Sequence, residues 1–236
     1  DLNDLLNNLK DINPDKFKES GNKDAAELYF VTKDTQTKDS NFKYKYNAYA
    51  PSISKDVQEK MLKITKEKLS KIIDNNYVQC EYNPAGQIDG VVETCNKNFV
   101  KNIDDIISSI EKEEIEKMIK VEDIHAYCFK FKRKDKGILA FRRFTKMKKL
   151  RDGFLGVFTN GTFGKINGDV LGIDNDIDLI LYDDRILILN HTSLERIFDL
   201  DEQFKSEAKK TISMIESQNK IVNIDEFEND VMNNIP

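Results

Sequence analysis

Apolar residues three and four positions apart predict amphipathic helices in several stretches of the chain. The sequence opens with one such series at Leu2, Leu5 and Leu9. Helices are predicted over residues 1–10, 54–73, 102–120 and 204–217. Thr192 and Glu195 have the spacing of a capping box, which predicts that a further helix begins at Thr192.

Alternation of apolar and polar residues, together with short continuous apolar runs, predicts strands between these helices. The predicted strands cover residues 26–32, 42–49, 77–82, 88–94, 124–132, 137–144, 154–159, 162–166, 177–182 and 185–189. Asn160-Gly161 is a strong signal for a tight hairpin turn between two of them. The strands 177–182 and 185–189 are apolar on both faces, which predicts a central position in a sheet covered on both sides.

These elements predict an α+β fold with mixed, largely antiparallel sheets that are built from hairpins and flanked by helices. Helices and strands alternate in the first half, whereas hairpins followed by helices fill the second. We therefore expect an N-terminal α/β subdomain over residues 1–121 and a hairpin-rich subdomain with C-terminal helices over residues 122–236. The polar residues 13–23 are expected to form a loop, and residues 219–236 a loosely ordered tail.

The composition is typical of an intracellular globular protein. With 236 residues, of which 39% are apolar, the chain is long enough to bury a sizeable core. No apolar run approaches the roughly 18 residues of a membrane-spanning helix, and no signal peptide opens the chain. Three cysteines without paired spacing argue against disulfides and for a reducing compartment, so the cytoplasm is the expected location. Because the first residue is Asp1 and not methionine, we expect further residues upstream.

Charge is distributed very unevenly along the chain. The net charge is -5, yet the 22 residues from Lys130 to Arg151 contain eleven basic residues and one acid, Asp135. That stretch therefore carries +10, which leaves -15 for the other 214 residues. The basic residues are Lys130, Lys132, Arg133, Lys134, Lys136, Arg142, Arg143, Lys146, Lys148, Lys149 and Arg151. We call this segment the basic stretch.

The basic stretch coincides with a predicted hairpin and the residues after it. We expect Lys130, Lys132, Lys134 and Arg142 to share a solvent face, while the aromatic and aliphatic side chains face the core. The latter are Tyr127, Phe129, Phe131, Leu139 and Phe141. Such a surface attracts the phosphate backbone of DNA through counterion release. The alternative is a solvated face, or a patch that pairs with acidic regions of the same chain.

Two groups of carboxylates are candidates for metal sites. Glu81, Asp89 and Glu93 lie on neighbouring predicted strands, as in a metal-dependent nuclease, but Cys95 stands where such a centre carries lysine. The aspartates at 174, 176 and 178 resemble the start of a calcium loop, but the sixth and twelfth positions, which should be Gly and Glu, are Leu179 and Arg185. This mismatch favours a structural role for the aspartates.

No catalytic residue, metal or cofactor is predicted. His125 and Cys128 form an isolated His-x-x-Cys pair, which does not support a zinc site. The chain has two histidines, and neither has the context of a nucleophilic triad.

The order of motifs in the second half resembles the KwaB family of the bacterial Kiwa antiphage system. The motifs are HAYCFKF at 125–131, ILAFRRF at 138–144, GFLGVF at 153–158, DIDLILYDD at 176–184, ILILN at 186–190 and LERIF at 194–198. The resemblance implies antiviral defence, DNA binding without known catalysis, self-association, and a membrane-protein partner encoded alongside. It supplies no catalytic residues. Family members usually continue beyond the position of Pro236.

The sequence leaves three functional hypotheses. The first is a defence protein that binds DNA through the basic stretch, forms homo-oligomers, and is recruited to the inner face of the membrane by a membrane-protein partner. The second is a metal-dependent nuclease that uses Glu81, Asp89 and Glu93 or the aspartates of 174–178. The third is an interaction module whose basic stretch docks on an acidic partner or on anionic lipid, without binding nucleic acid.

Overall fold

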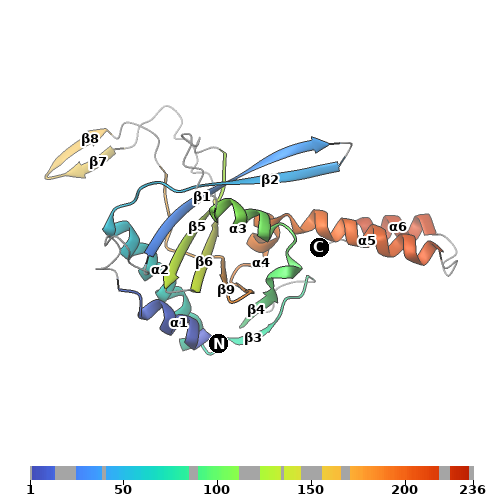
Figure 1. The fold of residues 1–236 in the computed structure, drawn as a ribbon, viewed down its shortest axis with the longest axis horizontal. Helices are drawn as coiled ribbons and strands as arrows, with labels where there is room; N and C mark the ends of the chain where they lie inside the picture. Colours follow the sequence, from blue (N-terminus) through green and yellow to red (C-terminus); the bar gives the residue numbers. More distant parts are fainter. Residues whose placement is uncertain are drawn as a thin grey trace.

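A computed structural model describes residues 2–13, 25–38, 41–84, 90–111, 123–133, 136–144, 156–165, 171–217 and 224–233 (Figure 1). The described helices are α1 (Leu2–Lys10), α2 (Lys55–Asp74), α3 (Ile103–Glu111), α4 (His191–Phe198), α5 (Leu200–Ser217) and α6 (Ile224–Asn233). The described strands are β1 (Ala25–Lys38), β2 (Asn41–Tyr49), β3 (Val78–Glu81), β4 (Val91–Asn96), β5 (Ile124–Arg133), β6 (Lys136–Arg143), β7 (Gly156–Thr159), β8 (Thr162–Lys165), β9 (Leu179–Tyr182) and β10 (Arg185–Ile188).

One eight-stranded sheet organises the fold, in the order β2-β1-β5-β6-β9-β10-β4-β3. All neighbours are antiparallel except β3 and β4, which run parallel. The α+β class with a mixed, largely antiparallel sheet is therefore confirmed. The expected boundary at residues 121/122 lies between strands of this one sheet, because β1 pairs with β5 and β4 pairs with β10. The hairpin β7–β8 forms a separate two-stranded sheet.

Helices cover both faces of the sheet, so the core has two parts. On one face, the leucines of α1 and the apolar side of α2 pack against the strands. On the other face, α3 and α4 pack against a second set of strand residues. Alternation along β5 divides its side chains between them: Tyr127, Phe129 and Phe131 face the first cluster, whereas Ala126 and Cys128 face the second.

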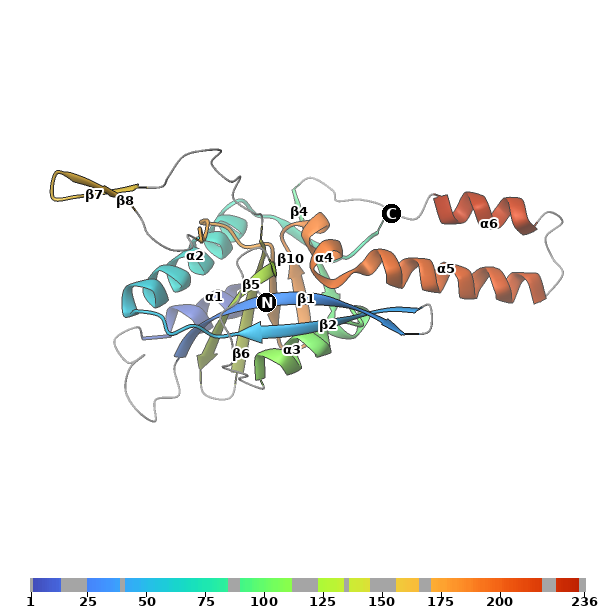
Figure 2. The same cartoon turned by 90° about the horizontal axis from the view of Figure 1, so that it is seen from above.

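The central position of β9 and β10 is confirmed. Ile180 and Leu187 are buried in the first cluster, and their neighbours in both strands are buried in the second. Of the described strands, β2 and β3 are the outermost in the sheet. Beyond the sheet, α5 and α6 lie side by side as an arm that extends away from the body (Figure 2).

Two details of the helix predictions were wrong. The cap of α4 is Asn190, whose side chain accepts a hydrogen bond from the backbone N–H of Ser193 at 2.9 Å; Thr192 already lies inside the helix. The tail after residue 219 is not irregular throughout, because Ile224–Asn233 is helical. The second half of the helix predicted over residues 102–120 lies outside the described residues, as do residues 14–23 of the predicted loop.

The capping assignment predicts unequal effects of two neighbouring substitutions. Asn190→Ala removes the acceptor for a helix N–H and should lower the free energy of unfolding by about 1 kcal/mol. Thr192→Ala, at an exposed helical position, should change it by less than about 0.5 kcal/mol. Urea unfolding of both variants measures this difference, and a larger loss in Thr192→Ala would contradict the assignment.

Candidate nucleic-acid interface

The basic stretch occupies the β5–β6 hairpin and the residues after it. The side chains of Lys130, Lys132, Arg142 and Arg143 are described. For Arg133 and Lys136, which pair at the end of the hairpin, the structure describes the backbone. The remaining members of the basic stretch lie outside the described residues: Lys134, Lys146, Lys148, Lys149 and Arg151.

The register of the hairpin corrects the expected solvent face. Residues that pair directly across two strands project to the same side of a sheet. Arg142 pairs with Tyr127, whereas Lys130 pairs with Leu139. Arg142 therefore lies on the face covered by α1 and α2, and Lys130 and Lys132 lie on the opposite face. For the same reason Leu139 and Phe141 do not share a face with Tyr127, Phe129 and Phe131.

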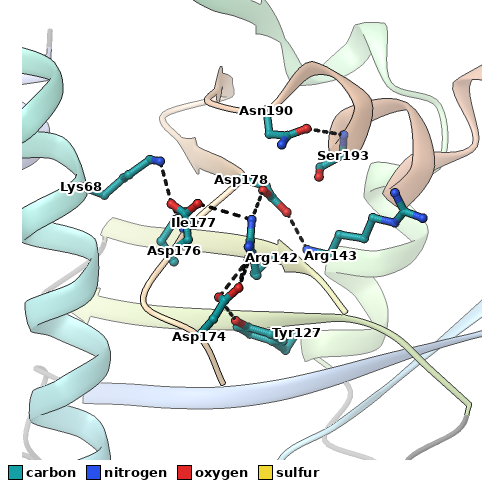
Figure 3. A network of polar contacts seen from close by, with 10 residues as sticks. All are labelled: Lys68, Tyr127, Arg142, Arg143, Asp174, Asp176, Ile177, Asp178, Asn190 and Ser193. Atoms are coloured by element: carbon teal, nitrogen blue, oxygen red, sulfur yellow. Dashed lines mark hydrogen bonds and ion pairs between the residues drawn. The ribbon is translucent and has the colours of Figure 1, made fainter. Parts of the chain in front are cut away.

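Arg142 is held by three aspartates from the segment that leads into β9 (Figure 3). Its Nη2 lies 2.5 Å from Oδ2 of Asp174, and its Nη1 lies 2.6 Å from Oδ1 of Asp178 and 3.6 Å from Oδ2 of Asp176. Its Nε also donates to both oxygens of Asp174, at 3.1 Å each. The guanidinium thus uses its planar fork of donors on carboxylates of its own chain.

Two further side chains complete this network, which we call the Arg142 clamp (Arg142, Asp174, Asp176, Asp178, Tyr127 and Lys68). The Tyr127 hydroxyl donates to Asp174 at 2.9 Å. Lys68 of α2 places its Nζ 2.6 Å from Oδ1 of Asp176. The clamp therefore joins α2, β5 and β6 to the entry of β9, and the three aspartates take part in it through these contacts.

Asp178 is the buried centre of the clamp, with a side chain 1% exposed. Its second carboxylate oxygen accepts the backbone N–H of Arg143 at 2.8 Å. Its own backbone donates to the carbonyl of Phe141 and accepts from Leu189 and Asn190. One residue thereby ties the end of β6 to the start of β9 and to the N-terminus of α4.

The electrostatics of the clamp favour the charged forms. Burial alone would lower the pKa of Arg142, but hydrogen bonds and charge interactions with Asp174 and Asp178 outweigh it and raise the pKa well above its ordinary value. Burial alone would raise the pKa of Asp174, but hydrogen bonds from Arg142 and Tyr127 outweigh it and lower the pKa. The positive charge of Arg142 is therefore balanced inside the protein.

The other described cations of the basic stretch are less constrained. Lys132 forms a long ion pair with Glu27, at 3.5 Å. The Lys130 ammonium lies 5.7 Å from the centre of the Tyr29 ring, within cation–π range. Arg143 is exposed, and Figure 3 shows its guanidinium extending away from Asp178. Arg143 is thus bound to the clamp by its backbone and not by its charge.

Two of the carboxylates considered for a nuclease centre, Glu81 and Glu93, make separate contacts. Glu81 is exposed and forms an ion pair with Arg185 at 2.9 Å. Glu93 is 1% exposed and accepts the backbone N–H of Asn83 at 3.2 Å. Asp89 lies outside the described residues. Among the residues that the structure describes, no three His, Cys, Asp or Glu side chains are grouped so as to hold a metal ion.

Sequence reasoning missed a polar cluster around His191. Its Nδ1 lies 3.3 Å from Glu195 and its Nε2 lies 3.0 Å from the carbonyl of Asn83 and 3.7 Å from Glu93. The ring of Tyr82 stacks on the imidazole, and burial raises the pKa of Tyr82. The i,i+4 spacing of His191 and Glu195 was visible, but nothing local linked them to residues a hundred positions earlier.

His125 and Cys128 are used in packing. The Nε2 of His125 lies 3.1 Å from the carbonyl of Ile197, and burial lowers its pKa. Cys128 is fully buried, and burial raises the pKa of its thiol. Burial thereby favours the neutral imidazole and the protonated thiol.

The clamp predicts very different roles for two adjacent arginines. Arg142→Met leaves the buried carboxylate of Asp178 without its ion-pair partner and should lower the free energy of unfolding by about 3 kcal/mol. Arg143→Met keeps the backbone hydrogen bond and should cost less than about 0.5 kcal/mol. Urea unfolding at neutral pH compares the two variants, and equal losses would show that Asp178 does not depend on Arg142.

Comparison with known proteins places part of the chain in a family of known description. Residues 121–235 match the family model described as "Kiwa protein KwaB-like". This segment contains the basic stretch and most of the Arg142 clamp, so the resemblance seen in the motifs is confirmed. No curated protein and no solved structure matches the chain. No helix among the described residues is both long enough and apolar enough to cross a membrane.

Proposed function

We propose that this protein, KwaB-like over residues 121–235, acts in Kiwa antiphage defence by binding DNA without cleaving it. The observation that carries the proposal is the local charge of +10 between Lys130 and Arg151, inside the matched segment of an otherwise acidic chain. Phosphates attract such a segment whatever the base sequence, because each neutralised phosphate releases counterions.

The geometry narrows which cations form the proposed surface. Arg142 is left out because three aspartates balance its charge. Lys130, Lys132 and Arg143 remain, and we propose that they act with the other basic residues of the stretch. These are Arg133, Lys134, Lys136, Lys146, Lys148, Lys149 and Arg151. The clamp supports the proposal indirectly. It fixes the end of β6, which directly precedes the remaining basic residues of the stretch in the sequence.

We further propose that the protein works in the cytoplasm with a membrane-protein partner of the same defence system, which recruits it to the inner face of the membrane. We also propose that copies of the protein associate with one another. The match to the Kiwa family model supports a role with partner proteins of the system. The arm formed by α5 and α6 lies away from the β5–β6 hairpin, which supports a partner surface separate from the proposed DNA surface (Figure 2).

Charge reversal tests DNA binding. The triple variant Lys134→Glu, Lys148→Glu, Lys149→Glu should lose most of its affinity for a duplex of mixed sequence. The slope of log K against log salt should become shallower by about three, one for each phosphate that is no longer neutralised. Fluorescence anisotropy at several salt concentrations measures both quantities.

The matched control reverses three exposed lysines elsewhere, Lys60 on α2 and Lys209 and Lys210 on α5. It changes the net charge by the same amount, and we expect its salt slope to stay within about one of the wild type. If the two triple variants behave alike, DNA responds to overall charge and the basic stretch is not the binding surface. A wild type that binds an acidic protein through the basic stretch but does not bind DNA would favour the interaction-module hypothesis.

A further inference from the structure

Among the described strands, β2 and β3 lie at the two edges of the sheet, and these edges differ in how they are protected. An edge strand exposes unpaired N–H and C=O groups, and proteins that must avoid pairing through an edge place lysine or proline there. At one edge, β2 carries the exposed Lys45 and packs against α3. At the other edge, β3 has the sequence Val-Gln-Cys-Glu, with neither lysine nor proline.

The backbone of β3 presents its unpaired groups outward. The N–H groups of Val78 and Tyr82 donate to carbonyls in and beside β4, at 3.4 and 2.9 Å. Because alternate residues of a strand point to the same neighbour, the N–H and C=O groups of Gln79 and Glu81 point away from β4. No described strand pairs with that side of β3.

The side chains along this edge favour an apolar contact. Tyr77 and Val78 are 39% and 66% exposed, which is unusual for large hydrophobic residues in this protein. The single charge in β3, that of Glu81, is matched by Arg185 at 2.9 Å. Two copies of the edge can therefore meet without bringing unbalanced like charges together.

We propose that β3 is the interface through which two copies of this chain associate, by antiparallel pairing of their β3 strands into one continuous sheet. A second copy is the occupant that this edge fits, because the outward donors and acceptors of Gln79 and Glu81 are self-complementary about a twofold axis. Exposed Val78 and Tyr77 then become covered on both copies. The inference rests on the self-association proposed above and does not depend on DNA binding.

One substitution removes a backbone N–H that points away from β4 and leaves the hydrogen bonds between β3 and β4 intact. Gln79→Pro deletes the N–H that points away from β4, a position where an edge strand tolerates proline. A symmetric dimer carries the substitution in both copies and therefore loses two hydrogen bonds. Dimerisation should weaken about ten- to a hundredfold. Gln79→Ala keeps the N–H and should associate like the wild type. Sedimentation equilibrium over a range of concentrations measures the association.

A second variant tests the β3 interface even if proline at position 79 disturbs folding. Val78→Lys adds a charge to the exposed edge without touching a backbone hydrogen bond, and it should weaken association by at least about tenfold. Met214→Lys, at a residue of α5 with similar exposure of 64%, is the matched control and should have no effect. In the wild type, the amide of Gln79 should exchange with deuterium more slowly as the protein concentration rises.

The outcomes separate the interface from self-association itself. A wild type that stays monomeric at all concentrations overturns both. Association that persists unchanged in both Gln79→Pro and Val78→Lys overturns the β3 interface and leaves self-association standing. Neither result bears on the affinity for DNA, which the charge-reversal variants report.

Discussion

The ion pair between Arg142 and the buried Asp178 is the interaction on which the second half of the structure depends. It joins the end of β6, where the chain leaves the eight-stranded sheet, to the start of β9, where the chain returns to it. The two residues are 36 positions apart in the sequence. A buried carboxylate is stable only when its charge is matched and its oxygens are hydrogen-bonded. Asp178 meets this condition through the side chain of Arg142 and the backbone of Arg143.

The same interaction distinguishes two neighbouring members of the basic stretch. Arg142 and Arg143 are adjacent, yet strand alternation sends their side chains to opposite faces of the sheet. One guanidinium is surrounded by Asp174, Asp176 and Asp178, and the other is exposed. A count of +10 therefore overstates the charge available to a ligand. The proposed DNA surface consists of the basic residues that the clamp does not hold, within the segment that is KwaB-like.

Much of the fold could be predicted because its signals are local. The helical spacing of the first leucines, the Asn160-Gly161 turn and the apolar run of β9 each specify an element without help from distant residues. The face of β6 could not be predicted in the same way. Its run from Ile138 to Phe141 is apolar at every position, so alternation does not choose a side. The pairing of Arg133 with Lys136 sets the register, and a slip of one residue would reverse every side chain.

The remaining errors have similar causes. Asn190 and Thr192 are both residue types that cap helices, and the choice between them follows from the backbone of Asn190, which Asp178 anchors. The helix α6 did carry a signal, since Phe227 and Val231 are four positions apart, but its many polar residues outweighed it. The Arg142 clamp and the His191 cluster unite residues that are far apart in sequence, and neither has a local motif.

The central claim is that the charge of Arg142 is used inside the protein while that of Arg143 is available to DNA. Nuclear magnetic resonance of the arginine Nε–Hε groups of the wild-type protein tests this claim. The Arg142→Lys and Arg143→Lys variants serve only to assign the two signals. On addition of duplex DNA, we expect the Arg143 signal to shift and the Arg142 signal, held by Asp174, to stay in place. An Arg142 signal that moves as much as that of Arg143 would contradict the account.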